Sequence, residues 1–125
     1  MDKGVEVEFR DDHVHVSLGP NYSFDPSGRD EVWSAIKSAC QDHNSRRVLV
    51  EGVVPEGERE TADVVAAGQR TAAVPHLWLA FHFENFVPTE QSELFEAIAA
   101  TRGVRVKFFA DREHALTWLR NNAPS

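Results

Sequence analysis

Residues 104–119 read VRVKFFADREHALTWL, and this stretch decides the fold class of the chain. Val104, Val106 and Phe108 alternate along it, as the residues on one face of a half-buried strand do. Asp111 then follows at a point where its side chain can accept hydrogen bonds from the free amides of the next turn. Beyond it, apolar residues recur at helical spacing: Ala115, Leu116 and Leu119. A strand that runs through one capping residue into an amphipathic helix is typical of a layered α/β domain.

The size of the chain favours a single domain. Its 125 residues are enough to bury about two-thirds of the surface that the unfolded chain exposes, so folding needs neither a disulfide nor a metal. We therefore expect one domain over residues 1–125, with an ordered core over residues 5–120. The single cysteine, Cys40, shares an expected helix face with Ile36 and Ala39, and no CxxC motif or basic run lies beside it. We interpret Cys40 as a buried structural thiol of a reducing cytoplasm.

The charge of the chain argues against two classes of partner. Thirteen basic residues stand against twenty acidic residues, the formal net charge is −7, and the arginines form no stripe. This balance argues against nucleic acid and anionic lipid surfaces, and it leaves a basic partner open. Residues 1–6 contain no apolar signal region, and no run approaches the roughly 20 apolar residues of a membrane span. We expect a soluble, cytoplasmic protein without a membrane span.

The first half of the chain predicts a hairpin, a helix and a buried strand. Val5–Phe9 and Val14–Leu18 alternate apolar and polar residues, and the short polar segment between them suits a turn. A helix is expected over Pro26–His43, where apolar residues recur on one face. The next segment, Arg47–Val54, is apolar and β-branched enough for a central strand that is buried on both faces.

The second half of the chain predicts two more strands and three more helices. A helix over about Glu58–Ala73 precedes a strand over His76–Phe83. Thr89 caps the following helix, Gly103 suits its left-handed end, and the segment at residues 104–119 closes the domain. The element order is therefore ββαβαβαβα. This order predicts an α/β domain with a mixed, mostly parallel sheet of about five strands, an N-terminal antiparallel hairpin and four helices.

The element order, the hairpin and the ending VKFFADREHALTWL at residues 106–119 together resemble the SpoIIAA-like branch of the STAS superfamily. Its members are small bacterial proteins that are often labelled STAS/SEC14 domain proteins. The resemblance covers nearly the whole chain, and its one motif is the ending. Regulatory STAS proteins act as anti-sigma-factor antagonists, so the resemblance implies a non-catalytic regulatory module that binds a protein partner. The resemblance predicts the fold more strongly than it predicts an activity.

The chain departs from the signature of the regulatory STAS proteins. That signature is an aspartate, a phosphorylatable serine, a second hydroxyl residue and a glycine after the central strand. Residues 51–61 here read EGVVPEGERET and lack the Asp-Ser-Ser-Gly sequence. Thr61 stands among Glu56, Glu58 and Glu60, where a phosphate of about −2 would meet like charges. We interpret Thr61 as a plain helix-start residue, and the acidic loop as the partner contact that the resemblance implies.

Motifs for catalysis are missing from the sequence. It contains no GxSxG elbow, no glycine-rich phosphate loop and no helical HExxH. The glutamates of the acidic loop could pair as acid and base, but a solvated acidic loop is far commoner. His13 and His15 point to one face of a strand, and His82 could complete a metal site from another strand. Because hairpin histidines are commonly solvated, we expect His13 and His15 to be solvated and to bind no metal. We also expect no enzyme activity and no cofactor.

Ligands on open α/β sheets tend to bind beyond the carboxyl ends of parallel strands. The loops Gly52–Glu60 and His82–Pro88 are expected at that edge. The second of these combines polar and apolar groups: His82, Phe83, Glu84, Phe86 and Val87. We interpret Phe83 and one of Phe86 or Val87 as core residues beneath the helix that Thr89 caps. The alternative is a binding rim for an apolar, lipid-like ligand or for a partner protein.

Two features favour a homodimer. Trp33 and Trp118 flank their helical stripes, so one or both can be partly exposed at a subunit contact, although core packing is the commoner role. The strand Val5–Phe9 has an open edge that must be protected. The expected function is a partner-binding module that uses the loop Gly52–Glu60 and the helix after it. The alternative is a small carrier or sensor of an apolar ligand.

Overall fold

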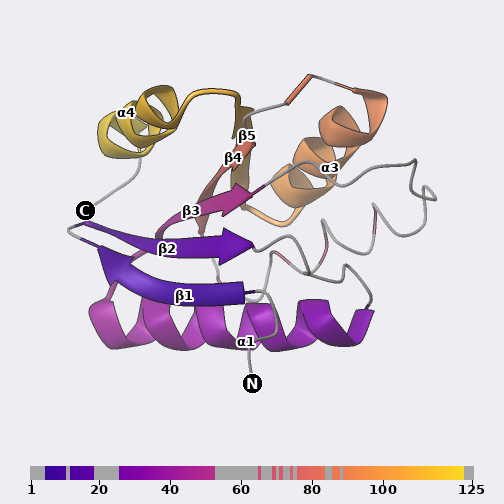
Figure 1. Cartoon of the computed structure of the whole chain (residues 1–125). Coiled ribbons are helices and arrows are strands. Elements are labelled where there is room, and N and C mark those ends of the chain that lie inside the picture. The colour runs from indigo at the N-terminus through magenta and orange to yellow at the C-terminus, as the bar shows by residue number, and fades with distance from the viewer. Residues whose placement is uncertain are drawn as a thin grey trace.

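The structure is a computed structural model that describes residues 5–10, 12–18, 26–52, 65, 69, 71, 74, 76–83, 86–87 and 89–122, with the backbone alone for residues 5, 18 and 26–31. A five-stranded sheet in the order β1-β2-β3-β4-β5 lies at its centre (Figure 1). β1 pairs with β2 in antiparallel fashion, and the other neighbouring strands are parallel. The strands are β1 Val5–Arg10, β2 His13–Leu18, β3 Arg47–Gly52, β4 Trp78–Phe83 and β5 Arg105–Phe109. The predicted mixed sheet with its N-terminal hairpin is confirmed.

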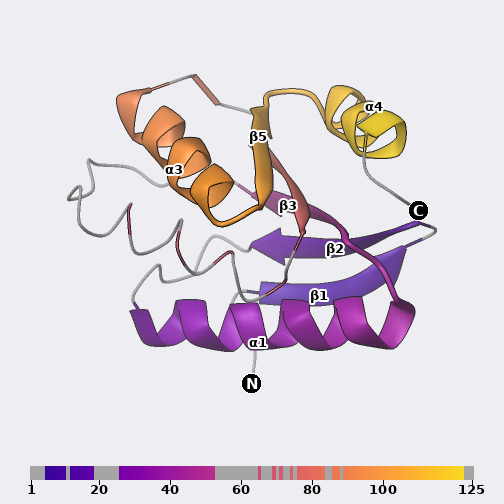
Figure 2. The same ribbon diagram turned by 180° about the vertical axis from the view of Figure 1, so that it is seen from behind.

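The described part of the chain contains three helices: α1 Pro26–His43, α3 Glu90–Thr101 and α4 Arg112–Asn122. α1 packs against β1 and β2, and α3 packs against β5. α4 packs against β3, β4 and β5, and Figures 1 and 2 show α3 and α4 on opposite sides of β4 and β5. The helix predicted over Glu58–Ala73 falls largely outside the described residues, although Val65 and Gln69 within it are helical. The fourth helix therefore stays a prediction.

Two apolar clusters fill the space on the two faces of the sheet. The cluster on the α1 and α3 face has these buried members: Val14, Val16, Ile36, Cys40, Val48, Val50, Val74, Leu77, Leu79, Ala99 and Val104. The cluster beneath α4 consists of Leu49, Ala80, Ala115 and Leu119. Successive residues of β3 alternate between the two clusters, as the strand period requires. Cys40 is 5% exposed, which confirms that the thiol is buried, and this burial raises the pKa of Cys40 to about 11.

The predicted caps hold the ends of the helices. The Thr89 hydroxyl accepts a hydrogen bond from the Ser92 N–H at 3.1 Å, and the Ser92 hydroxyl accepts one from the Thr89 N–H at 3.0 Å. Asp111 accepts a hydrogen bond from the Glu113 N–H at 2.8 Å. Gly103 has a φ of 80°, the left-handed value expected of it.

The start of β4 differs from its predicted position, and the backbone conformation gives the reason. A strand was predicted over His76–Phe83, but β4 begins at Trp78. His76 has a φ of 59° and therefore cannot continue an extended strand.

Among the described residues, no helix is long and apolar enough to cross a membrane.

Candidate functional site

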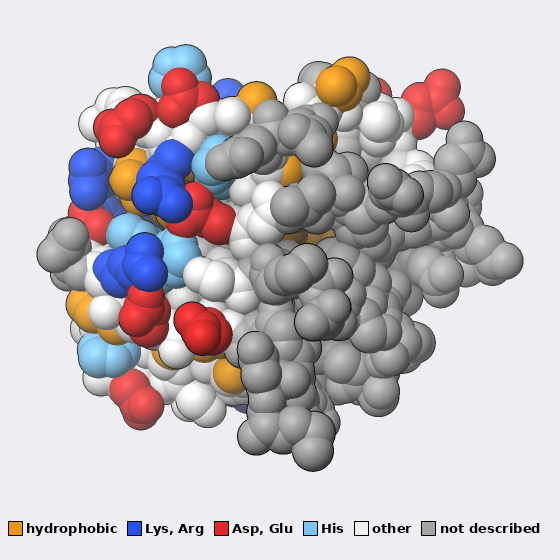
Figure 3. Space-filling view, viewed as in Figure 1, with side chains coloured by type: hydrophobic (Ala, Val, Ile, Leu, Met, Phe, Trp, Pro, Cys, Tyr) orange, Lys and Arg blue, Asp and Glu red, His pale blue; other side chains and the backbone are white. Residues whose placement is uncertain are grey.

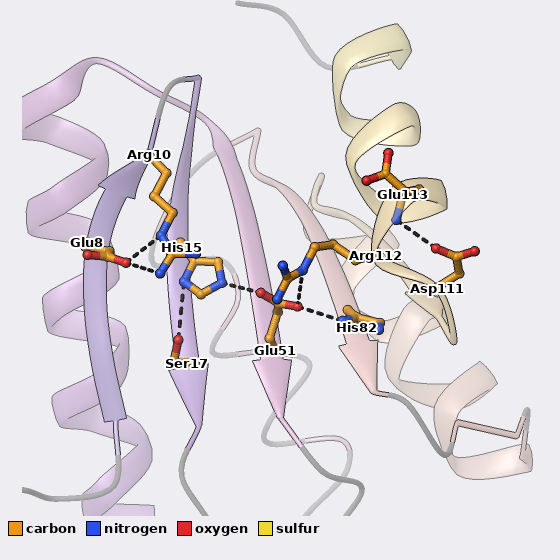
Figure 4. A network of polar contacts seen from close by, with 9 residues as sticks. All are labelled: Glu8, Arg10, His15, Ser17, Glu51, His82, Asp111, Arg112 and Glu113. Atoms are coloured by element: carbon orange, nitrogen blue, oxygen red, sulfur yellow. Dashed lines mark hydrogen bonds and ion pairs between the residues drawn. The ribbon is translucent and has the colours of Figure 1, made fainter.

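Polar side chains gather at the carboxyl ends of the parallel strands, on the face that α4 covers in part. Ser17 lies opposite Glu51, and Glu51 lies opposite His82, so these residues form one row across β2, β3 and β4. Each is the last residue but one of its strand. His15 points to the same face two residues before Ser17, and Arg112 reaches the row from the first position of α4 (Figure 4). We call these residues the Glu51 cluster: His15, Ser17, Glu51, His82 and Arg112.

Glu51 is the centre of the cluster. Its side chain is 11% exposed and accepts hydrogen bonds from His82 Nδ1 at 2.7 Å, from Arg112 Nε at 2.7 Å and from His15 Nε2. Burial alone would raise the pKa of Glu51, but the hydrogen bonds from Arg112, His15 and His82 and the charge of Arg112 hold that pKa at about 2. Glu51 is therefore an ionised carboxylate that accepts from three side chains at once.

The ionised carboxylate also fixes the imidazole tautomers. A carboxylate only accepts hydrogen bonds, so His15 Nε2 and His82 Nδ1 must carry hydrogens. Ser17 Oγ lies 3.3 Å from His15 Nδ1, within hydrogen-bond distance. The resulting order, Ser17 to His15 to Glu51, has the connectivity of a hydroxyl, a base and an orienting acid. Ser17, however, is half-buried within a strand and does not stand on an exposed turn.

A second carboxylate lies at the hairpin, before the start of β2 and so at the opposite end of this strand from the Glu51 cluster. Asp12 accepts hydrogen bonds from His13 Nδ1 at 3.0 Å, from Arg47 Nη1 at 3.2 Å and from Arg120 Nε at 3.2 Å. Burial works to raise the pKa of Asp12, but the hydrogen bonds from His13 and Arg120 lower it below its ordinary value. Since Arg112 and Arg120 come from opposite ends of α4, the two carboxylates hold both ends of this helix to the sheet. In Figure 3, charged and histidine side chains lie among one another on the left of the view, where Figure 1 has α4 and the hairpin.

The expectation that the hairpin histidines are solvated is wrong. His13 is 5% exposed and His15 is 3% exposed, because each is bonded to a carboxylate that satisfies its N–H while it is buried. The described residues include no group of three or more histidine, cysteine, aspartate or glutamate side chains that could hold a metal ion. His15 and His82 instead meet on the Glu51 carboxylate.

The two parts of the suggested apolar binding rim lie on opposite faces of the sheet. His82 faces Glu51, whereas Phe83 is 6% exposed and contacts the aromatic residues beneath α3. Phe86 is half-buried and stacks on Phe108 with ring centroids 5.1 Å apart, while Val87 is 70% exposed. Glu84 lies outside the described residues. The interpretation of Phe83 and Phe86 as packed residues agrees with these contacts.

The residues suggested for partner contact are not among those described. Glu56, Glu58, Glu60 and Thr61 belong to residues 53–64, which lie outside the described part of the chain. The last described residue before them is Gly52, which directly follows Glu51 at the end of β3.

The tryptophans have packing roles. Trp118 of α4 contacts Trp78 of β4 and Phe109 of β5, with ring centroids 5.4 Å and 5.8 Å apart. Trp33 of α1 is half-buried and packs against the cluster on the α1 and α3 face. Both side chains are half-buried, so each packs on its cluster and also keeps an exposed part, as was predicted for at least one of them.

Sequence reasoning missed the centre of the site. The sequence analysis places Glu51 within the central strand Arg47–Val54 and assigns no functional role to it, to Arg112 or to Arg120. The available signal was a charged residue inside a strand that otherwise reads as buried on both faces, since glutamate is rarely buried without a partner. The strand order that brings His15 and His82 to either side of Glu51 could not be seen in the sequence.

Comparisons with protein-family models, with curated proteins and with solved structures find no match to this chain.

Proposed function

We propose that the protein is a non-catalytic binding module of STAS type, which binds a protein partner at the carboxyl ends of β2, β3 and β4. The observation that carries this proposal is that the ionised Glu51 carboxylate already accepts hydrogen bonds from three side chains. A general acid or base must exchange a proton near the working pH. A carboxylate with a pKa of about 2 and hydrogen bonds from three side chains is unsuited to that task, and Ser17, the hydroxyl of the cluster, is half-buried within a strand and not on an exposed turn where a nucleophile would stand. It is suited to holding its neighbours in fixed positions.

The buried side chains of the cluster fix the ends of the three strands at which we propose that the partner binds. His15, Glu51 and His82 stand on three adjacent strands, and strands position side chains more tightly than loops do. Arg112 lies at the rim of the cluster, with 55% of its side chain exposed. A charged group at the rim of an interface influences the rate and specificity of association more than it influences affinity.

The acidic segment that follows β3 supports a partner with a basic face. Glu56, Glu58 and Glu60 come within nine residues of Glu51, and the whole chain has a net charge of −7. Charge complementarity would steer such a partner to this edge. Because the Asp-Ser-Ser-Gly sequence is missing, we propose that binding does not depend on phosphorylation of this loop.

Co-purification from the native host tests this proposal. The comparison is between the wild-type chain and a variant with Glu56, Glu58 and Glu60 replaced by alanine. The control changes the charge equally at exposed residues of the three helices: Asp42, Glu90 and Glu113. The acidic-loop variant should lose the partner while the control keeps it. Equal recovery with both variants would refute binding through this loop.

A carrier of an apolar, lipid-like ligand is the second candidate function. Val87 is the observation that favours it, since it is a large apolar side chain with 70% exposure beside Phe86. Entry of a ligand would require Phe86 to leave its stacked position on Phe108. Native mass spectrometry of protein from cells separates the two candidates, because a carrier retains a small molecule. A clean apo mass, with no thermal shift on adding fatty acids, would leave the partner-binding module.

A further inference from the structure

The outer edge of β1 has features of a subunit contact. In the described part of the chain, β1 pairs only with β2 and forms one end of the sheet (Figures 1 and 2). Glu6, Glu8 and Arg10 are exposed on one face of β1, and Val7 and Phe9 pack against the core on the other face. An open edge strand exposes a row of backbone N–H and C=O groups that another strand can pair with.

The hairpin determines which backbone groups face outward. Arg10 and His13 face each other across a two-residue connection. In such a hairpin the flanking pair exchanges both of its backbone hydrogen bonds, and hydrogen-bonded and non-hydrogen-bonded pairs then alternate along the strands. Glu6, Glu8 and Arg10 therefore direct their backbone groups to β2, while Val7 and Phe9 direct theirs to the outer edge.

We propose that two copies of the chain pair through β1 in antiparallel fashion, with Glu8 opposite Glu8 of the second copy. This register sets Glu6 of each copy against Arg10 of the other, and it sets Val7 against Phe9. Opposite charges and apolar pairs directly across two strands stabilise the pairing. The outward backbone groups of Val7 and Phe9 then bond across the two-fold axis.

The charges of β1 select this register over its neighbours. With Val7 opposite Val7, Glu6 would face Glu8 of the other copy twice, and like charges directly opposite are destabilising. With Phe9 opposite Phe9, only residues 8–10 of each strand would overlap. The proposed register overlaps residues 6–10, and its one like-charged pair, Glu8 with Glu8, is relieved because each Glu8 is already paired with Arg10 of its own chain.

The dimer goes beyond the proposed function because it would place two Glu51 clusters on one surface. A two-fold axis perpendicular to the sheet keeps the same face of both copies on the same side. The two sheets would join into one, and a partner with two matching sites would bind both clusters at once. The alternative is that the β1 edge stays exposed to solvent, since charged residues on an edge strand also prevent its pairing with another strand.

Single-cysteine crosslinking tests the register. In E8C the two new thiols face each other across the axis, whereas in E6C and R10C each faces a different side chain. Directly opposite Cβ atoms lie about 4.5–5.5 Å apart, whereas the two copies of residue 6, or of residue 10, lie four positions apart along the strands, roughly 13 Å, so we expect E8C to form a disulfide-linked dimer at least about tenfold faster than E6C or R10C. Cys40 is buried, and oxidised wild-type protein supplies the blank.

Light scattering of the unmodified wild-type chain completes the test. A mass of twice 14.0 kDa is expected, with a return to the single mass in E6R, which sets arginine against Arg10. The double variant E6R/R10E restores the opposite-charge pairs and should recover the dimer at least in part. A wild-type mass of 14.0 kDa at millimolar protein concentration would overturn the proposal. Faster crosslinking of E6C than of E8C would overturn the register. Circular dichroism of each variant shows that the fold is intact.

Discussion

Replacing Glu51 by glutamine is the most direct test of the cluster at the carboxyl ends of the strands. Glutamine keeps the size of the side chain but removes the charge that His15, His82 and Arg112 bind. The pKa of Glu51 is lowered from 4.5 to about 2 in the folded protein. That change corresponds to about 3 kcal/mol of folding free energy, at about 1.4 kcal/mol for each tenfold change in proton affinity.

The dependence on pH has a definite sign. Because the folded pKa of Glu51 lies below its ordinary value, the carboxylate stabilises the fold fully above about pH 4.5, and this contribution is lost as the pH falls toward 2. The difference in unfolding free energy between wild type and E51Q should therefore be about 3 kcal/mol at pH 7 and should shrink as the solution is acidified through that window.

Urea unfolding at several pH values measures this difference. The matched control is Glu8→Gln, which removes the same charge from a side chain with 53% exposure, paired with Arg10. An exposed pair of this kind contributes less than about 1 kcal/mol. A difference for E51Q that matches the control at pH 7, or that stays constant between pH 7 and pH 3, would refute the account of Glu51 as a charge held by three donors.

Three further predictions concern other parts of the molecule. Thr89→Ala removes half of the capping box of α3 and should lower the unfolding free energy by about 1 kcal/mol in urea, whereas the exposed control Thr117→Ala should change it by less than about 0.5 kcal/mol. Leu119→Ala truncates a side chain of α4 that is 1% exposed and should lower the unfolding free energy by about 2–5 kcal/mol in the same assay. A smaller loss of unfolding free energy would show that α4 is loosely packed. If the Ser17, His15 and Glu51 chain is structural, a fluorophosphonate probe should not label Ser17, and labelling that S17A abolishes would contradict the non-catalytic proposal.

Local patterns in the sequence were sufficient for most of the described fold. Pro26–His43 was predicted with the bounds that α1 has. Thr89, Gly103 and Asp111 were each assigned the role that the backbone gives them, because capping depends on neighbouring residues alone.

The candidate site depends on contacts that no local pattern contains. His15, Glu51 and His82 meet because β2, β3 and β4 are neighbours, and a strand order is a property of the whole sheet. His13 and His15 looked like solvated hairpin residues since their partners, Asp12 and Glu51, could not be assigned to them from spacing. The residues after β3 and β4 on which the partner and ligand suggestions rested, Glu56 to Thr61 and Glu84, lie outside the described residues, so those suggestions stay predictions.

Because Arg112 and Arg120 lie in α4, their contacts with Glu51 and Asp12 form only after α4 has been synthesised. The contact between Asp12 and Arg120 joins residues 108 positions apart, and the contact between Glu51 and Arg112 joins residues 61 positions apart. A nascent chain that has left the ribosome only as far as β5 holds Asp12 and Glu51 without the arginines of α4, and Leu49 and Ala80 without their apolar cover. Until α4 emerges, that face of the sheet is open to chaperones and proteases. α4, which follows all five strands of the sheet along the chain, thus closes the surface that the β1–β2 hairpin begins.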